Sequence, residues 1–424
     1  MEKLIIEGGR KLTGTTTIHG AKNAALPILA ASLLVRGKHY IHNVPHLLDI
    51  KVMVNILREL GCRVEHLDET IVLDSEGIHS HHISKTLMQQ MRSSIFLMGP
   101  LLARMGKVQF YQPGGCAIGQ RKIDLHLRGL EALGATVSEC DNTIVCTVDK
   151  LVGAPIKLDY PSVGATENIM MAAVLAEGTT TIYNAAREPE IEDLQNYLNI
   201  MGADITGAGT DTIKIHGIKQ LNKQDYTVIP DRIVTGTLMI AAAVTQGNIT
   251  LKNVNPSHLS ALIHVLRRCG SQIEVDGDII RVSSSLRLKP LEQIVTMPYP
   301  AFPTDLQAQI MVLLALSDGT SMLKETVFDG RFKHVEQLVE MGADIKVADK
   351  IAYINGVKHL KGSTVYATDL RAGAALIIAA LAAKGTTIIH DIHHIDRGYD
   401  GIEHYFNQLG AVVKRLSTSA VVNQ

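Results

Sequence analysis

The 424-residue chain has no tryptophan, and aromatic residues make up only 4% of it. Hydrophobic residues nevertheless account for 46%, an ordinary value for a soluble globular protein. The core must therefore be built from aliphatic side chains. A chain of this length is expected to form two or three domains.

The chain also lacks an excess of either charge, with 41 basic and 42 acidic side chains and a net charge of −1. Near-neutrality argues against a nucleic-acid or membrane-surface partner, so an anion site requires a local concentration of cations. The longest apolar run, from Ala372 to Ala383, is too short to cross a bilayer. We expect no nucleic-acid, membrane or obligatory protein partner.

Cysteines are few, and their pattern indicates a reducing compartment. The chain has five, an odd number, and no Cys-x-x-Cys pair. The N-terminus does not resemble a signal peptide, because acidic residues flank its very short apolar run. The sequence therefore predicts a cytoplasmic protein.

Motifs for a cofactor are missing as well. No GxGxxG follows a strand pattern, and no GxxxxGK[ST] occurs. Two histidine groups, within residues 79–82 and 390–394, have no acid or cysteine at convincing ligand spacing. We therefore expect neither a metal nor an organic cofactor.

What the chain does contain is a unit that is repeated six times. In each copy an apolar helix-like segment ends in a glycine, and a short β-branched strand pattern follows. These glycines are Gly37, Gly106, Gly178, Gly247, Gly319 and Gly385. A second, amphipathic helix then ends at Gly61, Gly134, Gly202, Gly270, Gly342 and Gly410. Each glycine is typical of a helix C-cap that leads into a strand.

Six units of this length fit two lobes of three better than an open array. The predicted fold class is therefore α/β, with two domains of three repeats each. Residues 230–232, near the middle of the chain, are a natural crossing point between the lobes. A two-lobed protein has a cleft in which ligands bind.

Residues 113–121, PGGCAIGQR, place Cys116 in a glycine-rich loop that ends at Arg121. Their repeat spans 28 residues from Gly106 to Gly134, whereas the other copies span 23 to 25, so the loop is an insertion. Its N–H groups can face an anion, and the arginine favours a thiolate. The alternative is a structural turn with a small buried cysteine, which would not need the extra residues.

Charged residues begin the first helix of most repeats. The equivalent positions hold Lys22, Arg92, Gly164, Arg232, Asp305 and Arg371. Cations there oppose the helix macrodipole, so four of them indicate an anionic ligand. The alternative is that each long side chain turns out into water. Asp305 is either a helix cap or a general base that orients a hydroxyl.

Arg121 and Arg397 occupy equivalent positions at the expected start of the second helix in the second and sixth repeats. An aspartate follows three residues later in both, at Asp124 and Asp400. Two such arginines, one from each lobe, predict a cationic cleft that closes on a multiply anionic ligand.

Taken together, these motifs resemble the enolpyruvyl transferases over essentially the whole chain. The segments that carry the resemblance are residues 20–24 (GAKNA), 91–94 (MRSS), 113–119 (PGGCAIG) with Arg121, 161–166 (PSVGAT), 230–232 (PDR), 302–305 (FPTD), 331–332 (RF), 368–372 (TDLRA) and 396–398 (DRG). Several of them together are far more specific than any one motif.

The resemblance implies two inside-out α/β barrels of three repeats each, with the helices inside and a ligand cleft between them. One lobe would be residues 21–229 and the other residues 1–20 plus 230–424. The implied reaction transfers the enolpyruvyl group of phosphoenolpyruvate to the 3′-hydroxyl of UDP-N-acetylglucosamine and releases phosphate, in peptidoglycan synthesis. It needs no cofactor.

By position, the resemblance implies two binding sets. Phosphoenolpyruvate would be held by Lys22, Asn23, Arg121, Arg371 and Arg397. UDP-N-acetylglucosamine would be held by Asn23, Arg92, Arg121, Lys122, Ile123, Asp124, Leu125, Ser162, Val163, Gly164, Asp305 and Val327. The catalytic set would be Cys116, Asp305, Lys22 and Arg397, with Asp369 and Arg371 in the cationic wall.

Within the catalytic set, Asp305 would orient or deprotonate the hydroxyl. Cys116 would be the acid on the loop, able to form a covalent adduct with the enolpyruvyl carbon. The chain departs from the family at Lys122, where proline is common, and at residues 329–330, where glutamate-asparagine is common.

Two alternatives stay open. The sister activity on shikimate 3-phosphate is expected to use a serine-rich N-terminal segment and no cysteine loop, and this chain has the opposite pattern. A catalytically silent UDP-sugar sensor would not need both Cys116 and Asp305.

Replacing the loop cysteine tests its role. We expect Cys116→Ser to abolish inactivation by an epoxide phosphonate such as fosfomycin, because a hydroxyl is a far weaker nucleophile than a thiolate. The measurement is residual activity after preincubation, with Cys140→Ser as the control. Undiminished inactivation of Cys116→Ser would remove the cysteine from this role.

Overall fold

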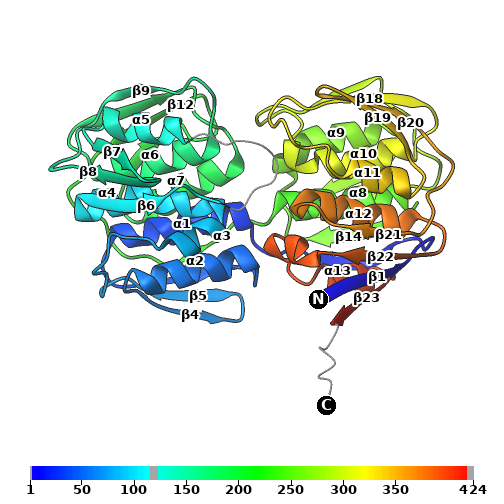
Figure 1. The fold of residues 1–424 in the computed structure, drawn as a ribbon, viewed down its shortest axis with the longest axis horizontal. Helices are drawn as coiled ribbons and strands as arrows, with labels where there is room; N and C mark the ends of the chain where they lie inside the picture. Colours follow the sequence, from blue (N-terminus) through cyan, green and yellow to red (C-terminus); the bar gives the residue numbers. More distant parts are fainter. Residues whose placement is uncertain (1, 115–122, 418–424) are drawn as a thin grey trace, which may run out of the picture. The chain divides into compact units, whose positions relative to one another are not determined.

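The computed structural model describes residues 2–114 and 123–417 of the chain. These residues form two compact units. The first unit contains residues 20–114 and 123–229, and the second contains residues 2–19 and 230–417. Figure 1 shows that both units combine helices with short strands, so the predicted α/β class is confirmed.

The first unit has three sheets among its described residues, with strand orders β13-β3-β5-β4, β6-β8-β7 and β11-β12-β10-β9. Its strands are β3 (Lys38–His42), β4 (Arg63–Leu67), β5 (Thr70–Asp74), β6 (Lys107–Tyr111), β7 (Thr136–Cys140), β8 (Thr143–Thr147), β9 (Pro155–Lys157), β10 (Thr179–Tyr183), β11 (Asp204–Thr206), β12 (Thr212–His216) and β13 (Tyr226–Thr227). Its helices are α1 (Lys22–Ala31), η1 (Ser32–Leu34), α2 (Leu48–Glu59), α3 (Lys85–Gln90), η2 (Arg92–Leu97), α4 (Met98–Met105), α5 (Asp124–Ala132), α6 (Val163–Ala173) and α7 (Pro189–Ile200).

The second unit has the sheets β15-β16-β14-β2, β17-β18-β20-β19 and β21-β22-β1-β23 within the described chain. Its strands are β1 (Glu2–Glu7), β2 (Thr13–Thr17), β14 (Asn248–Lys252), β15 (Gln272–Asp276), β16 (Ile279–Ser283), β17 (Gln293–Val295), β18 (Thr320–Lys324), β19 (Asp344–Ala348), β20 (Ile351–Asn355), β21 (Thr364–Tyr366), β22 (Thr386–His390) and β23 (Val412–Ser417). Its helices are α8 (Arg232–Val244), η3 (Pro256–Leu259), α9 (Ser260–Arg268), η4 (Thr304–Leu306), α10 (Gln307–Ala315), α11 (Val335–Glu340), α12 (Leu370–Ala382), η5 (Ile392–Arg397) and α13 (Ile402–Gln408).

In each four-stranded sheet one pair of neighbouring strands is parallel and the other pairs are antiparallel. In the second unit β2 runs parallel to β14, β17 to β18 and β21 to β22. The N-terminal strand β1 lies between β22 and the C-terminal strand β23, antiparallel to both (Figure 1). Both ends of the described chain therefore belong to one sheet of the second unit.

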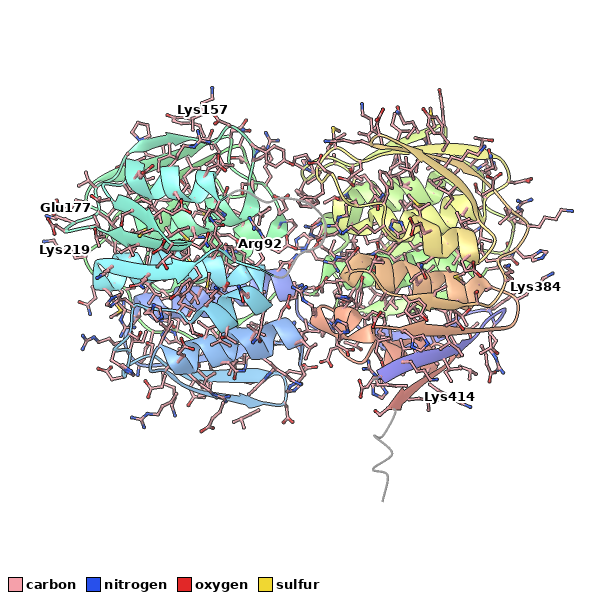
Figure 2. All side chains as sticks on the ribbon, viewed as in Figure 1. Arg92, Lys157, Glu177, Lys219, Lys384 and Lys414 are labelled. Carbon is pink, nitrogen blue, oxygen red and sulfur yellow. The ribbon has the colours of Figure 1, made fainter. Side chains whose placement is uncertain are left out.

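Aliphatic helices form the interior of each unit. Every residue of α10 is buried, and α8 and α12 are buried along nearly their whole length. The second helices of the repeats are amphipathic instead: α9 buries Leu262, Ile263, Val265 and Leu266 and exposes its polar face. Charged side chains such as Lys157, Lys384 and Lys414 are exposed on the surfaces of their units (Figure 2).

The glycines that end the helices have the geometry of C-caps. Gly61, Gly134, Gly202, Gly270, Gly342 and Gly410 all have positive φ, from 83° to 108°. This conformation favours glycine, so the predicted caps of the second helices are confirmed. Gly247 differs from the other glycines that follow a first helix, because it has no positive φ; a Cβ there would lie 2.4 Å from the Leu12 carbonyl oxygen.

A buried histidine links two helices of the first unit. The Oδ1 of Asn168 on α6 accepts from the Gly99 N–H at 2.9 Å, so its amide nitrogen faces Nδ1 of His126 on α5, 2.9 Å away. His126 Nδ1 must therefore accept, which requires a neutral ring. Burial, with a smaller effect of the nearby Arg92 charge, lowers the pKa of His126 to about 3.

This histidine makes stability depend on pH. The unfolded chain protonates His126 near its usual pKa of about 6.5, so the folded state loses stability as pH falls from there towards 3. One such group contributes a slope of about 1.4 kcal/mol per pH unit at most. We expect His126→Gln to flatten the dependence of the unfolding free energy on pH between 6.5 and 4, as measured by urea denaturation.

The control is His264→Gln on the exposed face of α9, which should leave the slope unchanged. An equal slope in wild type and His126→Gln would show that His126 does not carry this dependence.

Candidate functional site

Asp305 in η4 is held by two arginines of the second unit. Its Oδ1 accepts from Arg331 Nη2 at 2.6 Å and its Oδ2 from Arg371 Nη2 at 3.0 Å. The arginine side chains are 4% and 8% exposed, whereas that of Asp305 is 27% exposed. A carboxylate fixed in this way can orient a hydroxyl group.

Two of the predicted cations, Arg371 and Arg232, lie at helix N-termini that are capped by an aspartate. Asp369 caps α12 and accepts from the N–H of Arg371 at 2.9 Å. Asp231 caps α8, which begins at Arg232, and accepts from Ile233 N–H at 2.7 Å. These carboxylates offset the unfavourable placement of a cation at a helix N-terminus.

The ion pair with Asp305 also keeps Arg371 charged although it is buried. Burial by itself lowers the pKa of Arg371, but the charges of Asp305, Tyr399 and Asp231 outweigh it and raise the pKa above its usual value. Tyr399 is 2% exposed, lies under the Arg371 guanidinium at 5.9 Å, and shares a hydrogen bond of 2.9 Å with Thr237. Arg371 is thus a fixed cation.

Glu325 connects the segment of Asp305 to that of Val327. Its Oε2 accepts from the Thr304 hydroxyl at 2.9 Å. Its Oε1 accepts from the N–H groups of Val327 at 2.8 Å and Phe328 at 3.0 Å. The side chain is completely buried, so these three donors are what compensates its desolvation. Glu325 was not predicted from the sequence, because only the fold brings residues 304 and 327 to the same carboxylate.

Arg397 occupies a different local position from the one expected. It is the last residue of the 3-10 helix η5, and α13 begins only at Ile402, so the prediction that it starts the second helix is wrong. Residues 398–401 intervene, and Gly398 packs where a Cβ would lie 2.7 Å from Leu370 Cδ2. The pKa of His394 is lowered by burial and by the charges of His393 and Arg397, whereas the charge of Asp369 raises it. Arg397 therefore lies near the capped start of α12.

In the first unit, Lys22 begins α1 and forms a buried ion pair. Its Nζ lies 3.1 Å from Asp49 Oδ2, and the two side chains are 10% and 4% exposed. This ion pair holds the Lys22 ammonium at the start of α1. Asp49 lies in the first turn of α2, where acidic residues are common. Its local sequence therefore did not predict a partner for Lys22.

Ser162, Val163 and Gly164 form the N-terminal turn of α6. Ser162 is the N-cap, and its Oγ accepts from Ala165 N–H at 3.4 Å. A Cβ on Gly164 would lie 3.0 Å from His126 Cε1 and 3.2 Å from the Phe96 ring, so a larger residue here would require these side chains to shift. The turn is therefore closely packed against His126 and Phe96.

Glu167, one turn further along α6, is completely buried, and neither of its carboxylate oxygens has a hydrogen-bond partner. Burial and the nearby charges of Glu190 and Glu188 raise its pKa well above the usual value. The carboxyl is thus held in its neutral form. Glu167 was not predicted, because the sequence around a single glutamate does not indicate whether its side chain is buried.

The remaining predicted residues of the first unit have varied surroundings. Asn23 and Arg92 are half-buried at the starts of α1 and η2, and Arg92 is labelled in Figure 2. Asp124 is exposed and pairs with Arg128 at 3.2 Å. Ile123 is buried in the apolar core of the unit. Cys116, Arg121 and Lys122 lie outside the described residues.

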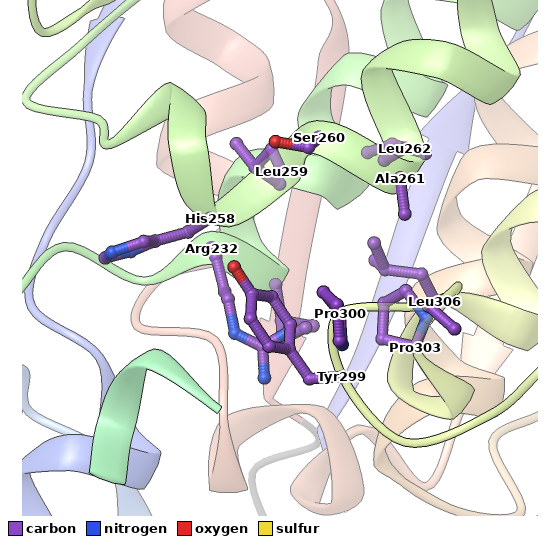
Figure 3. A pocket seen from close by; sticks show the side chains of 12 residues that line it. Arg232, His258, Leu259, Ser260, Ala261, Leu262, Tyr299, Pro300, Pro303 and Leu306 are labelled. Carbon is purple, nitrogen blue, oxygen red and sulfur yellow. The ribbon is translucent and has the colours of Figure 1, made fainter. Parts of the chain in front are cut away.

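The second unit has a small pocket next to the Asp305 segment. It has a volume of about 60 Å³ and is lined by residues of α8, η3, α9 and the 299–306 segment. Figure 3 shows the Arg232 side chain beside the Tyr299 ring, and the guanidinium lies 5.4 Å from the ring centre.

Residues 2–114 and 123–417 contain no cluster of three histidine, cysteine, aspartate or glutamate side chains that could hold a metal ion. In the same residues, no helix is long and apolar enough to span a bilayer.

Comparisons with known proteins agree with these motifs. Residues 6–406 match the family model described as EPSP synthase (3-phosphoshikimate 1-carboxyvinyltransferase). The chain is 51% identical over 416 residues to UDP-N-acetylglucosamine 1-carboxyvinyltransferase 2 of Caldanaerobacter subterraneus, covering 98% of this chain and 100% of that protein. It is 52% identical over 419 residues to the protein of the same name from Carboxydothermus hydrogenoformans, with the same coverage.

Solved structures give the same result for the fold. The enolpyruvyl transferase NikO from Streptomyces tendae superposes with a TM-score of 0.88 at 25% identity over 99% of both chains. An EPSP synthase from Acinetobacter baumannii has a TM-score of 0.75 at 18% identity over 98% of this chain and all of its own. With the family model spanning nearly the whole chain, the resemblance inferred from the motifs is confirmed: this chain belongs to the EPSP synthase family of enolpyruvyl transferases.

Proposed function

We propose that this enzyme transfers the enolpyruvyl group of phosphoenolpyruvate to the 3′-hydroxyl of UDP-N-acetylglucosamine and releases phosphate, the first committed step of peptidoglycan synthesis. The observation that carries the proposal is full-length identity of about 50% to proteins named for this activity. The Asp305 carboxylate held between Arg331 and Arg371 supports it, because the acceptor hydroxyl must be oriented as it loses a proton.

In the proposed reaction the acceptor oxygen bonds to C2 of phosphoenolpyruvate while C3 gains a proton. Asp305 takes up the proton of the acceptor hydroxyl, and Cys116 supplies the proton that the methylene carbon C3 gains. Loss of a proton from C3 then expels phosphate and restores the double bond. Fixed cations stabilise the phosphate and carboxylate throughout, without reorganising during the reaction.

The binding roles follow the motif positions and are part of the proposal. Lys22, Asn23, Arg121, Arg371 and Arg397 would hold phosphoenolpyruvate. The nucleotide sugar would lie against Asn23, Arg92, Arg121, Lys122, Ile123, Asp124, Leu125, Ser162, Val163, Gly164, Asp305 and Val327. The buried Ile123 would contribute through its backbone, because its side chain belongs to the core.

We also propose that residues 21–229 and residues 1–20 plus 230–424 act as the two functional lobes. The six sheets of the described chain are consistent with six copies of one unit, three in each lobe, whose helices lie inside an inside-out barrel. None of these sheets closes on itself. The proposed protein works in the cytoplasm on two small molecules, without a nucleic-acid, membrane or obligatory protein partner.

One assay separates the candidate functions. We expect purified enzyme to release phosphate from phosphoenolpyruvate with UDP-N-acetylglucosamine and not with shikimate 3-phosphate, measured as inorganic phosphate against time. Release only with shikimate 3-phosphate would assign the sister activity. No release with either acceptor, combined with nucleotide-sugar binding in a calorimeter, would identify a sensor.

A second prediction concerns the carboxylate. We expect Asp305→Asn to lower kcat by about 10²- to 10⁴-fold, because the amide keeps the shape but cannot take up the hydroxyl proton. The matched control is Asp318→Asn, which removes an exposed carboxylate paired to Arg287 at 2.7 Å in the same unit. Equal kcat values for Asp305→Asn and wild type would exclude Asp305 from proton transfer.

A further inference from the structure

Arg415 on β23 uses all of its hydrogen-bond donors on three carboxylates. An arginine has five N–H groups. Nε donates to Glu403 Oε1 at 2.7 Å, and Nη2 donates to Glu403 Oε2 at 3.1 Å and to Asp396 Oδ1 at 2.7 Å. Nη1 donates to Asp396 Oδ2 and to Glu2 Oε2, both at 3.0 Å. Two of the three carboxylates are thus held by two bonds each, the geometry that fixes a side chain most strongly.

The cluster is shielded from water more than an ordinary surface ion pair is. The side chains of Arg415 and Asp396 are 22% and 23% exposed, and that of Glu403 is 11% exposed. The hydrogen bonds that Arg415 donates to Asp396 are the largest cause of the raised pKa of Arg415. The five bonds and the partial burial set this cluster apart from exposed pairs, which contribute little.

The two strongly held carboxylates stand on either side of Arg397 in the chain. Asp396 is its direct neighbour at the end of η5, and Glu403 lies in the first turn of α13. Arg415 therefore fixes both ends of residues 396–403, the segment that carries Arg397. Within this segment Gly398 packs against Leu370, and Tyr399 is fixed by Thr237.

Arg415 is also the positive charge shared by these three carboxylates. Without it, Asp396 and Glu403 would be left as partly buried carboxylates without their partner. Loss of Arg415 would therefore loosen the segment that carries Arg397 and change the orientation of the Arg397 guanidinium.

We propose that Arg415 is a positioning residue for phosphoenolpyruvate binding, acting through Asp396 and Glu403 on the orientation of Arg397. The inference rests on the proposed function, because it takes Arg397 as a contact of phosphoenolpyruvate. Arg415 itself touches neither substrate. Its effect is on the affinity for the anionic substrate rather than on the proton transfers.

The test is steady-state kinetics of Arg415→Met in the full-length enzyme. We expect the KM for phosphoenolpyruvate to rise by about 10- to 100-fold, the range expected when a binding group is displaced by about 1 Å. The KM for UDP-N-acetylglucosamine should stay within about twofold, since surface changes away from a ligand have small effects. Arg415→Lys should be intermediate, because an ammonium keeps the charge and loses the planar fork.

A rescue variant separates positioning from general stability. Adding Asp396→Asn to Arg415→Met removes one of the partly buried carboxylates that lost its arginine, so the segment is less disturbed and we expect part of the phosphoenolpyruvate affinity to return. The matched control is Arg287→Met, which removes an arginine of the same unit that bonds Asp318 at 2.7 Å and the Ser317 carbonyl at 2.9 Å. It should lower the thermal midpoint without changing either KM.

The outcomes distinguish the two proposals. If the wild type turns over and Arg415→Met has an unchanged KM for phosphoenolpyruvate, Arg415 is structural only and this inference is wrong. If both KM values rise together, the effect is general and the inference is equally wrong. A wild type that releases no phosphate overturns the proposed function, and this inference with it.

Discussion

Complete burial of the aliphatic helices is the constraint on which the rest of each unit depends. A chain without tryptophan builds its core from alanine, leucine, isoleucine and valine, and these residues cover all sides of α10. A helix that is buried all round presents only its ends to other groups. Functional side chains of the second unit are therefore concentrated at the starts of α8 and α12 and in η4, which precedes α10.

Charge at a buried helix start needs compensation, and the structure supplies it with carboxylates. Asp231 and Asp369 cap the helices that begin next to Arg232 and Arg371. Asp305 lies between Arg331 and Arg371, and Lys22 pairs with Asp49 in the first unit. Each of these cations thus has a carboxylate close by, and Arg371 is kept charged although it is buried. These are the properties that a site for a multiply anionic substrate requires.

Much of the local structure could be predicted because it depends on neighbours in the chain. The glycines after the second helices adopt positive φ as expected, and the charged residues at 22, 92, 232 and 371 lie at helix starts. Arg397 shows the limit of this reasoning. Its equivalence to Arg121 placed it at a helix start, but the turn of residues 398–401 separates it from α13 because Gly398 packs closely on Leu370.

The sequence by itself determined the α/β class, the family and the residue types of the candidate site, because glycine caps, apolar periodicity and short motifs are local. Only the tertiary structure decided which carboxylate each cation meets. Asp49 is 27 residues from Lys22, Asp305 is 66 residues from Arg371, and Arg415 reaches Glu2 from the other end of the chain. Such pairs form where separate elements pack together, so the spacing of residues in the sequence does not predict them.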